Sequence, residues 1–310
     1  MGGHLPRFVA AGEALTDLIL VGDDQWISRV GGSTWNVARG VAAQGVASAF
    51  AGSISRCWFG DALWRASEQA GLDLRFLQRV ERSPLLAIVP QSTPPQYFFI
   101  GDESADLHFD PAALPVGWQH AVQWIHFGGI SLARQPLADR LVALATELHA
   151  QGVAISYDPN FRNLMDAHYL VTFERMCRLA QVIKVSDEDL AGLMPNEDPR
   201  HALRLARGWN PQAWWLYTEG ANGAQLLTPA GHWQARPPEI TVIDTVGAGD
   251  ACIAALVASR MQSPDESPAV HLGRAIAAAA AACQFAGASP PSREATLALF
   301  SKVQVRRATG

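Results

Sequence analysis

In the second half of the chain, short apolar runs alternate with longer stretches in which apolar residues recur at helical spacing. The pattern predicts strands and helices in turn, with strands at 122–127, 153–157, 182–185 and 214–218 and helices at 136–150 and 169–180. Buried strands separated by helices are typical of right-handed βαβ units, which build a parallel sheet with helices on both faces. We therefore expect an α/β fold with a mostly parallel central sheet.

The beginning of the chain carries shorter patterns. Apolar residues on both sides of Gly12 predict two strands within 7–21. After the Gly31-Gly32 turn, Ser33 or Thr34 is expected to cap a helix that ends at Gly45.

A buried strand at 46–53 and a helix at 59–70 are expected next. Two further apolar runs, 85–89 and 96–100, are separated by a proline-rich turn. Because both runs are short and alternate poorly, we expect them to form a small separate sheet.

Composition narrows the class of protein. Of 310 residues, 49% are hydrophobic and 17% are charged, which describes a globular chain with a sizeable core. The formal net charge of −5 and the lack of a basic run argue against nucleic acid as a partner. Four widely spaced cysteines fit reduced thiols better than a disulfide framework or a zinc site. No apolar run is long enough to span a bilayer, so we expect a cytoplasmic protein without membrane contact.

The most informative stretch is DTVGAGD, Asp244–Asp250, which opens an apolar, helix-like run. Small residues before a helix leave its first N–H groups free to bind an anion. Asp250 at this position also suits a plain helix cap. An anion site beside a carboxylate fits phosphoryl transfer, in which N–H groups hold the moving phosphoryl and the carboxylate accepts a hydroxyl proton.

Other nucleotide motifs are missing from the sequence. There is no Gly-Lys-Ser/Thr, which excludes a P-loop. Lys184, one of two lysines, lies far along the chain from any glycine-rich loop, so we do not expect it to act as the strand lysine of a kinase site. A dinucleotide-dependent oxidoreductase would need G-x-G-x-x-G after an early strand, and Gly31-Gly32 does not match that pattern.

Together with an earlier Gly-Gly-x-x-x-Asn pattern that ends at Asn36, the DTVGAGD motif resembles the ribokinase-like (PfkB) carbohydrate kinases, and among them most closely the bacterial fructokinases. The resemblance runs from Gly12 to about Pro291. It implies one kinase domain over residues 1–310 with a three-layer α/β/α arrangement. A small β-sheet lid, built from about 9–30 and 85–107, would cover the site.

The resemblance also implies roles for individual residues. Asp250 matches the catalytic base, and Gly247, Ala248 and Gly249 match the anion hole for the transferred phosphoryl group. The positions that match the sugar-binding side are Asp17, Gly32, Asn36 and Arg162, to which we add Trp35 because smaller residues are usual beside the asparagine. We expect its ring to stack on the sugar or narrow the pocket. The positions on the nucleotide side are Ser186, Thr218, Gly220, Gly223 and Gly249.

Two segments depart from the family pattern, one at the expected Mg²⁺ position and one in the lid, and a further position concerns K⁺. The family's Asn-x-x-Glu, linked to magnesium and phosphate, appears here as Ser186 to Asp189, and the shorter Asp carboxylate would reach Mg²⁺ directly or through water. Asp244 matches a residue near a K⁺ site of some members. The aromatic lid segment 97–106 lacks the arginine that often follows it in fructokinases and in 2-keto-3-deoxygluconate kinases.

The resulting hypothesis is an ATP- and Mg²⁺-dependent sugar kinase that phosphorylates a primary hydroxyl, with fructose as the first candidate substrate. A kinase of 2-keto-3-deoxygluconate, of another sugar or of a nucleoside stays open. So does a sugar-binding regulator without catalytic activity on the same scaffold, because pocket residues alone do not prove turnover. Pairing of lids into a homodimer is familiar in the family and is left open by the sequence.

Overall fold

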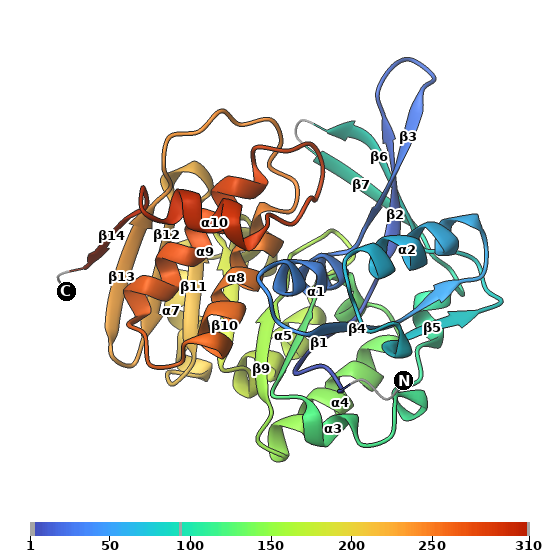
Figure 1. Cartoon of the computed structure of the whole chain (residues 1–310), viewed down its shortest axis with the longest axis horizontal. Coiled ribbons are helices and arrows are strands. Elements are labelled where there is room, and N and C mark those ends of the chain that lie inside the picture. Colours follow the sequence, from blue (N-terminus) through green and yellow to red (C-terminus); the bar gives the residue numbers. More distant parts are fainter. Residues whose placement is uncertain (1–3, 93–94, 309–310) are drawn as a thin grey trace.

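The computed structural model describes residues 4–92 and 95–308, and within them two separate sheets, the larger one surrounded by helices (Figure 1). The described part of the large sheet has ten strands. Seven are parallel, in the order β11 (Trp214–Thr218), β10 (Val182–Ser186), β9 (Ala154–Asp158), β8 (Trp124–Gly128), β1 (Phe8–Ala11), β4 (Ser48–Ser55) and β5 (Leu77–Val80). An antiparallel edge continues from β11 through β12 (Ala224–Thr228), β13 (Gly231–Arg236) and β14 (Gln304–Arg307).

Helices cover both faces of this sheet, because its parallel strands are apolar on both sides. One face packs against α1 (Ser33–Ala43), α2 (Trp58–Gln69), α8 (Ala248–Gln262) and α9 (Pro268–Ala282), with α10 (Arg293–Phe300) beside α9. The other face packs against α3 (Trp118–Ala121), α4 (Leu137–Ala150), α5 (Tyr169–Leu179), α6 (Asp187–Leu193) and α7 (Pro199–Trp209). The predicted α/β fold is confirmed. Over the described ranges, the chain has no helix with the length and apolar character that crossing a membrane requires.

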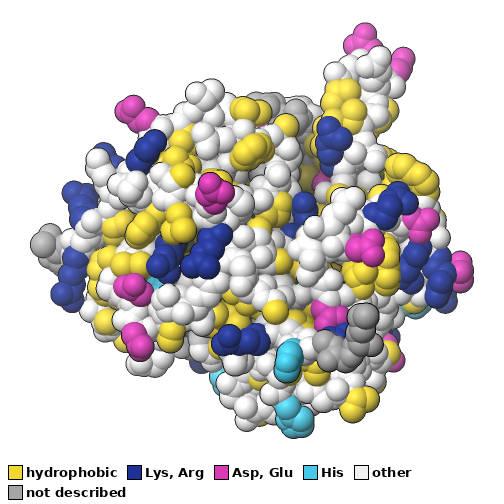
Figure 2. Space-filling model, in the orientation of Figure 1, with side chains coloured by type: hydrophobic (Ala, Val, Ile, Leu, Met, Phe, Trp, Pro, Cys, Tyr) yellow, Lys and Arg dark blue, Asp and Glu magenta, His cyan; other side chains and the backbone are white. Residues whose placement is uncertain are grey.

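The small sheet has the order β3-β2-β6-β7 and projects beyond the large sheet at the upper right of Figure 1. Its strands are β2 (Leu15–Leu20), β3 (Trp26–Gly31), β6 (Leu86–Ser92) and β7 (Pro95–Ile100). The sheet therefore begins later than the predicted lid, since Val9 lies in β1 of the large sheet. On the face shown in Figure 2, basic and acidic side chains are interspersed, and the tip of the β2–β3 hairpin carries acidic ones.

Helices α1 and α8 lie close enough to bring their first turns together. A Cβ atom added to Gly40 of α1 would lie 2.7 Å from the Cβ of Ala254, so only glycine allows this approach. The start of α1 differs from the prediction, because its N-cap is Gly32, with φ 111° and no side-chain capping bond. Ser33 and Thr34 are instead the first helical residues, and their hydroxyls are free for other partners. Gly45, with φ 88°, follows the helix as predicted.

Candidate active site

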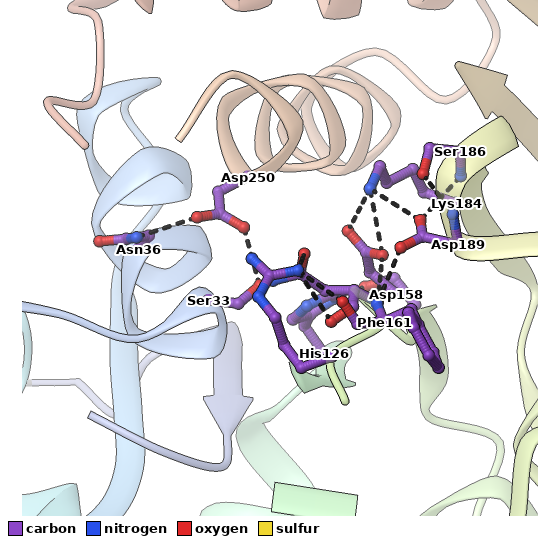
Figure 3. Close-up of polar contacts among 12 residues, drawn as sticks. Ser33, Asn36, His126, Asp158, Phe161, Lys184, Ser186, Asp189 and Asp250 are labelled. Atoms are coloured by element: carbon purple, nitrogen blue, oxygen red, sulfur yellow. Dashed lines mark hydrogen bonds and ion pairs between the residues drawn. The ribbon is translucent and has the colours of Figure 1, made fainter. Parts of the chain in front are cut away.

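The site is centred on Asp250 in the first turn of α8, where that turn meets the first turn of α1 (Figure 3). One carboxylate oxygen, Oδ1, accepts a 2.7 Å hydrogen bond from the Ser33 hydroxyl. The other, Oδ2, accepts a 2.9 Å hydrogen bond from the side-chain amide of Asn36. Asn36, predicted as a sugar-binding residue, therefore lies beside Asp250, whereas neither its bond to Asp250 nor Ser33 as a partner was predicted.

Burial raises the pKa of Asp250 above its ordinary value, although the hydrogen bonds from Asn36 and Ser33 and the charges of Lys184 and Arg162 oppose the rise. A carboxylate with a raised pKa is a stronger base. The side chain is also held by hydrogen bonds at both oxygens, which fixes its direction. Asp250 is thus suited to accept a proton from a hydroxyl that binds within hydrogen-bond distance of it.

The turn before Asp250 depends on small residues. Gly247 is the N-cap of α8 in the left-handed region, with φ 81°, and a Cβ atom on it would lie 2.8 Å from the Cα of Ala288. Ala248 and Gly249 follow as the first helical residues. Because the first N–H groups of a helix lack helical partners and lie at its positive end, this turn can bind an anion beside Asp250.

Lys184 is a site residue that sequence reasoning missed. It is only 5% exposed in the middle of β10, and its Nζ lies 3.0 Å from Oδ2 of Asp158 and 3.5 Å from Oδ2 of Asp189 (Figure 3). A Cβ atom on Gly249 would lie 3.3 Å from the same Nζ. Although Lys184 is far along the chain from the glycine turn, the fold places its ammonium directly beside it. A charged residue within the apolar run 182–185 was the signal in the sequence.

The pKa values in this cluster follow from two carboxylates sharing one ammonium. Burial alone would lower the pKa of Lys184, but Asp158 and Asp189 raise it above its ordinary value, so the lysine stays charged. Burial raises the pKa of Asp158 to about 7, against the influence of Lys184. Lys184 and backbone N–H groups lower the pKa of Asp189 in spite of its burial. Lys184 thus stays protonated beside Gly249, and its charge is balanced by Asp189 and in part by Asp158.

The Asp189 side chain joins the start of α6 to the loop after β9. Its Oδ1 accepts from the Phe161 N–H at 2.8 Å, and its Oδ2 accepts from the Ser186 N–H at 2.8 Å. The Ser186 hydroxyl in turn accepts from the Asp189 N–H at 2.9 Å, which completes a capping box at the start of α6. Each carboxylate oxygen accepts one backbone hydrogen bond, and coordination of Mg²⁺ by Asp189, direct or through water, stays a prediction.

The small sheet contributes Asp17, on β2, to the same region. Burial raises the pKa of Asp17 to about 6, with Asp250 raising it further and Arg162 opposing the rise. The position of the Asp17 side chain depends on Gly31 of the paired strand β3, because a Cβ atom on Gly31 would lie 2.5 Å from Oδ2 of Asp17. Gly32 is constrained as well, because a Cβ atom there would lie 2.6 Å from the carbonyl oxygen of Glu13.

Arg162 connects the two sheets. Its guanidinium lies 4.9 Å from the ring centroid of Tyr97 on β7, and Nη1 donates to Oδ1 of Asn160 at 2.9 Å. Its charge acts on both Asp17 and Asp250. The predicted substrate-side residues Asp17, Asn36 and Arg162 therefore surround Asp250.

The prediction for Trp35 is wrong. The side chain is 0% exposed and belongs to the core beneath α1, where its Nε1 donates to the Ser67 hydroxyl at 2.9 Å. The Arg39 guanidinium lies 4.3 Å from the ring centroid. A ring enclosed in this way packs the core and cannot stack on a sugar.

Four of the predicted nucleotide-side residues, Ser186, Thr218, Gly220 and Gly223, lie at or after the ends of β10 and β11, whereas Gly249 belongs to the turn at the start of α8. Thr218 pairs with Ser186 at the carboxyl ends of adjacent parallel strands. The turn after it has positive φ angles at Gly220 (53°) and Gly223 (102°), and a Cβ atom on Gly223 would lie 2.1 Å from the carbonyl oxygen of Ala235. Glycine is therefore required for this turn, and its contact with a nucleotide stays a prediction.

Asp244 joins the loop before α8 to the loop after α9. Its Oδ1 accepts from the Val246 N–H at 3.0 Å, and its Oδ2 accepts from the Gly287 N–H at 2.8 Å. These bonds account for an aspartate at this position, and the K⁺ site near it stays a prediction.

Most of the chain is similar in sequence to known proteins. A family model described as pfkB family carbohydrate kinase matches residues 7–294. The chain is similar to the fructokinase of Klebsiella pneumoniae, with 32% identity over 256 residues that cover 80% of this chain and 82% of that protein. It is also similar to the aminoimidazole riboside kinase of Salmonella typhimurium, with 27% identity over 79% of this chain and 78% of that protein.

Solved structures share the fold. The fructokinase with bound ATP from Xylella fastidiosa superimposes with a TM-score of 0.86 at 24% identity, covering 96% of this chain and 99% of that one. The fructokinase from Vibrio cholerae O395 with fructose, ADP and a calcium ion gives a TM-score of 0.84 at 25% identity, with the same coverage of 96% and 99%.

Proposed function

Because the chain belongs to the pfkB family of carbohydrate kinases, we propose that it transfers the γ-phosphoryl group of ATP to a primary hydroxyl of fructose. The family makes it a phosphotransferase that acts on a sugar hydroxyl, and the identity of the sugar is the proposal. The observation that carries the catalytic assignment is the Asp250 carboxylate, held by Ser33 and Asn36 at the N-terminus of α8.

In the proposed reaction, the hydroxyl oxygen attacks the γ-phosphorus while its proton passes to Asp250. The bond from the γ-phosphorus to the bridging oxygen breaks, and ADP leaves with that electron pair. The N–H groups around Gly249 stabilise the charge that gathers on the moving phosphoryl group, and the buried ammonium of Lys184 adds a nearby positive charge. Mg²⁺ is expected to arrive on the nucleotide phosphates, which it binds together with water more readily than an all-protein cage.

The small sheet supports a second part of the proposal, which is closure over the sugar. Asp17 and Tyr97 come from this sheet, whereas Asp250 lies at the start of α8 and Arg162 lies in the loop that follows β9 of the large sheet. A sugar bound between them would be enclosed by both. Enclosure suits a kinase, because water reaching the phosphoryl group would otherwise be phosphorylated in place of the sugar.

The charges around the acceptor favour a neutral sugar over an acid. Two carboxylates, Asp17 and Asp250, face the guanidinium of Arg162 in this region, and the ammonium of Lys184, which also acts on Asp250, is already paired with Asp158 and Asp189. A 2-keto-3-deoxygluconate molecule would bring a further carboxylate against cations that already face carboxylates. Similarity to relatives named fructokinase supports fructose, and similarity to an aminoimidazole riboside kinase makes a riboside the second candidate.

The test is release of ADP, coupled to NADH oxidation, with ATP and Mg²⁺ and one acceptor at a time. The panel holds fructose, tagatose, ribose, aminoimidazole riboside, adenosine and 2-keto-3-deoxygluconate. We expect the highest kcat/KM on fructose. Preference for a riboside or for the keto acid would refute the substrate assignment but keep the kinase. ADP release without any acceptor dependence, or none at all while fructose still binds calorimetrically, would refute the catalytic proposal.

A further inference from the structure

Glu13 is a buried carboxylate at the crossing between the two sheets. It lies between β1 of the large sheet and β2 of the small sheet, and it is 2% exposed. No lysine or arginine lies within ion-pair distance of it in residues 4–92 and 95–308. A buried carboxylate without a cation is costly, so its hydrogen-bond partners must account for its presence.

Those partners come from two other segments. Oε1 accepts from the Ser33 N–H at 3.2 Å, in the first turn of α1. Oε2 accepts from the Ser131 N–H at 3.2 Å and from the Ser131 hydroxyl. Gly129 completes the cradle, since a Cβ atom there would lie 2.2 Å from Oε1. The carboxylate thus ties α1 to the turn after β8 at the point where the chain passes from one sheet to the other.

Ser33 links Glu13 to the catalytic carboxylate of Asp250 through two hydrogen bonds. Its N–H is bound by Glu13, and its hydroxyl donates to Asp250 at 2.7 Å. Gly32, the N-cap of α1, has no side chain with which to cap the helix, so Glu13 supplies the missing acceptor from a distance. A second bond strengthens the same junction, because the Thr34 hydroxyl donates to the carbonyl oxygen of Glu13 at 2.9 Å.

We propose that Glu13 is a positioning residue for phosphoryl transfer, which holds Ser33 so that Ser33 in turn orients Asp250. The proposal rests on the assignment of Asp250 as the base. It links the junction of the two sheets to the catalytic carboxylate through one residue. A displacement of the small sheet that moves Glu13 would therefore also move the base.

The surroundings of Glu13 make this link dependent on pH. Burial raises the pKa of Glu13 to about 7, while the hydrogen bonds from Ser131 oppose the rise and the charge of Asp106 adds to it. Arg134 is paired with Asp106 at 3.0 Å, and Tyr169 at the start of α5 faces the same region. As the pH falls through about 7, Glu13 takes up a proton and becomes a weaker acceptor for Ser33. We expect kcat to fall with it.

The test compares Glu13→Gln with Ser131→Ala on the sugar that gives the highest turnover. We expect Glu13→Gln to lower kcat by about tenfold to a hundredfold, the scale of a small misplacement of a reacting group, with a much smaller change in KM. The decline of kcat near pH 7 should become shallower in this variant and keep only the contribution of Asp158, whose pKa also lies near 7. Compared well above pH 7, where Glu13 is ionised, Ser131→Ala spares the bond to Ser33 and should keep kcat within about twofold. Because this variant removes a hydrogen bond that lowers the pKa of Glu13, its decline of kcat should begin at higher pH than in the wild type. Equal losses in both variants, or an unchanged kcat and pH profile in Glu13→Gln, would overturn the proposal.

Two further measurements test the role of Glu13 even if Glu13→Gln folds poorly or if Asp250 is not the base. If Glu13 acts through Ser33, the double variant of Glu13→Gln and Ser33→Ala loses no more kcat than the worse single variant. Losses that multiply would contradict the link. The amide resonance of Ser33 should titrate near pH 7 in the wild type and stay constant in Glu13→Gln, and this readout needs no turnover. Absence of turnover in the wild type refutes the proposed function, whereas a Ser33 amide that does not titrate refutes the role of Glu13.

Discussion

Replacing Asp250 with asparagine separates the proton acceptor from the shape of the site. The asparagine oxygen can accept from Asn36, and its NH₂ group can donate to the oxygen of Ser33, so both neighbours keep a partner. Volume and hydrogen bonds are nearly conserved, and what is lost is the negative charge that takes up the hydroxyl proton.

The expected magnitudes follow from that loss. A positioned general base contributes about 10²- to 10⁴-fold to the rate, which corresponds to about 3 to 5 kcal/mol of transition-state free energy. Stability should move in the opposite direction. Because burial raises the folded-state pKa of Asp250, ionisation disfavours the folded protein, and this penalty grows as the pH rises above the ordinary pKa. The Asp250→Asn variant escapes the penalty, so its melting temperature at pH 8 should equal or exceed that of the wild type.

The assay is ADP release at saturating ATP and sugar, with sugar affinity measured by calorimetry and folding by thermal denaturation. We expect kcat to fall at least a hundredfold, consistent with loss of a general base, while sugar affinity and melting temperature are retained. A kcat within about threefold of the wild type would refute the assignment of the base. Loss of kcat together with loss of folding would show instead that the charge of Asp250 supports the structure.

Three other substitutions test neighbouring parts of the argument. Lys184→Met leaves two buried carboxylates without their cation, so the free energy of unfolding in urea should fall by about 3 to 5 kcal/mol; Asp158→Asn in the same chain should restore part of it, and no restoration would contradict the shared charge. Trp35→Phe should lower the melting temperature and leave the KM for the sugar unchanged, whereas a raised KM would revive a contact with the sugar. Gly247→Ala forces a Cβ atom to within 2.8 Å of Ala288 at a positive φ, so kcat should fall with sugar binding retained, and an unaltered kcat would show that this turn does not serve the transfer.

The large sheet was predictable because its strands are buried on both faces. A continuous apolar run such as 182–185 or 214–218 leaves few alternatives to a parallel strand, and the structure places β10 and β11 at 182–186 and 214–218. The small sheet was located only in part. Its strands are half exposed and carry a weaker pattern, which is why its predicted range included Val9 of the large sheet.

The site was predictable where one short motif carries the geometry, as in the turn from Gly247 to Asp250. It was not predictable where the partner lies in a distant segment. Glu13 and Lys184 each stand in an apolar context, and nothing local shows that one will meet Ser33 and the other Gly249. The prediction for Trp35 failed because it was based on the neighbouring Asn36. Adjacent residues on a helix point in different directions, so Trp35 faces the core although Asn36 faces the site.

The base is therefore a product of helix packing as much as of its motif. Asp250 is oriented by α1, and α1 reaches α8 only because Gly40 lets the two helices approach at Ala254. Small residues in these two helices look like ordinary core positions in the sequence. In the fold they set the distance between Ser33, Asn36 and Asp250, because any side chain at position 40 would push the first turns apart. The hydrogen bonds that orient the base thus depend on a contact that lies outside every motif of the chain.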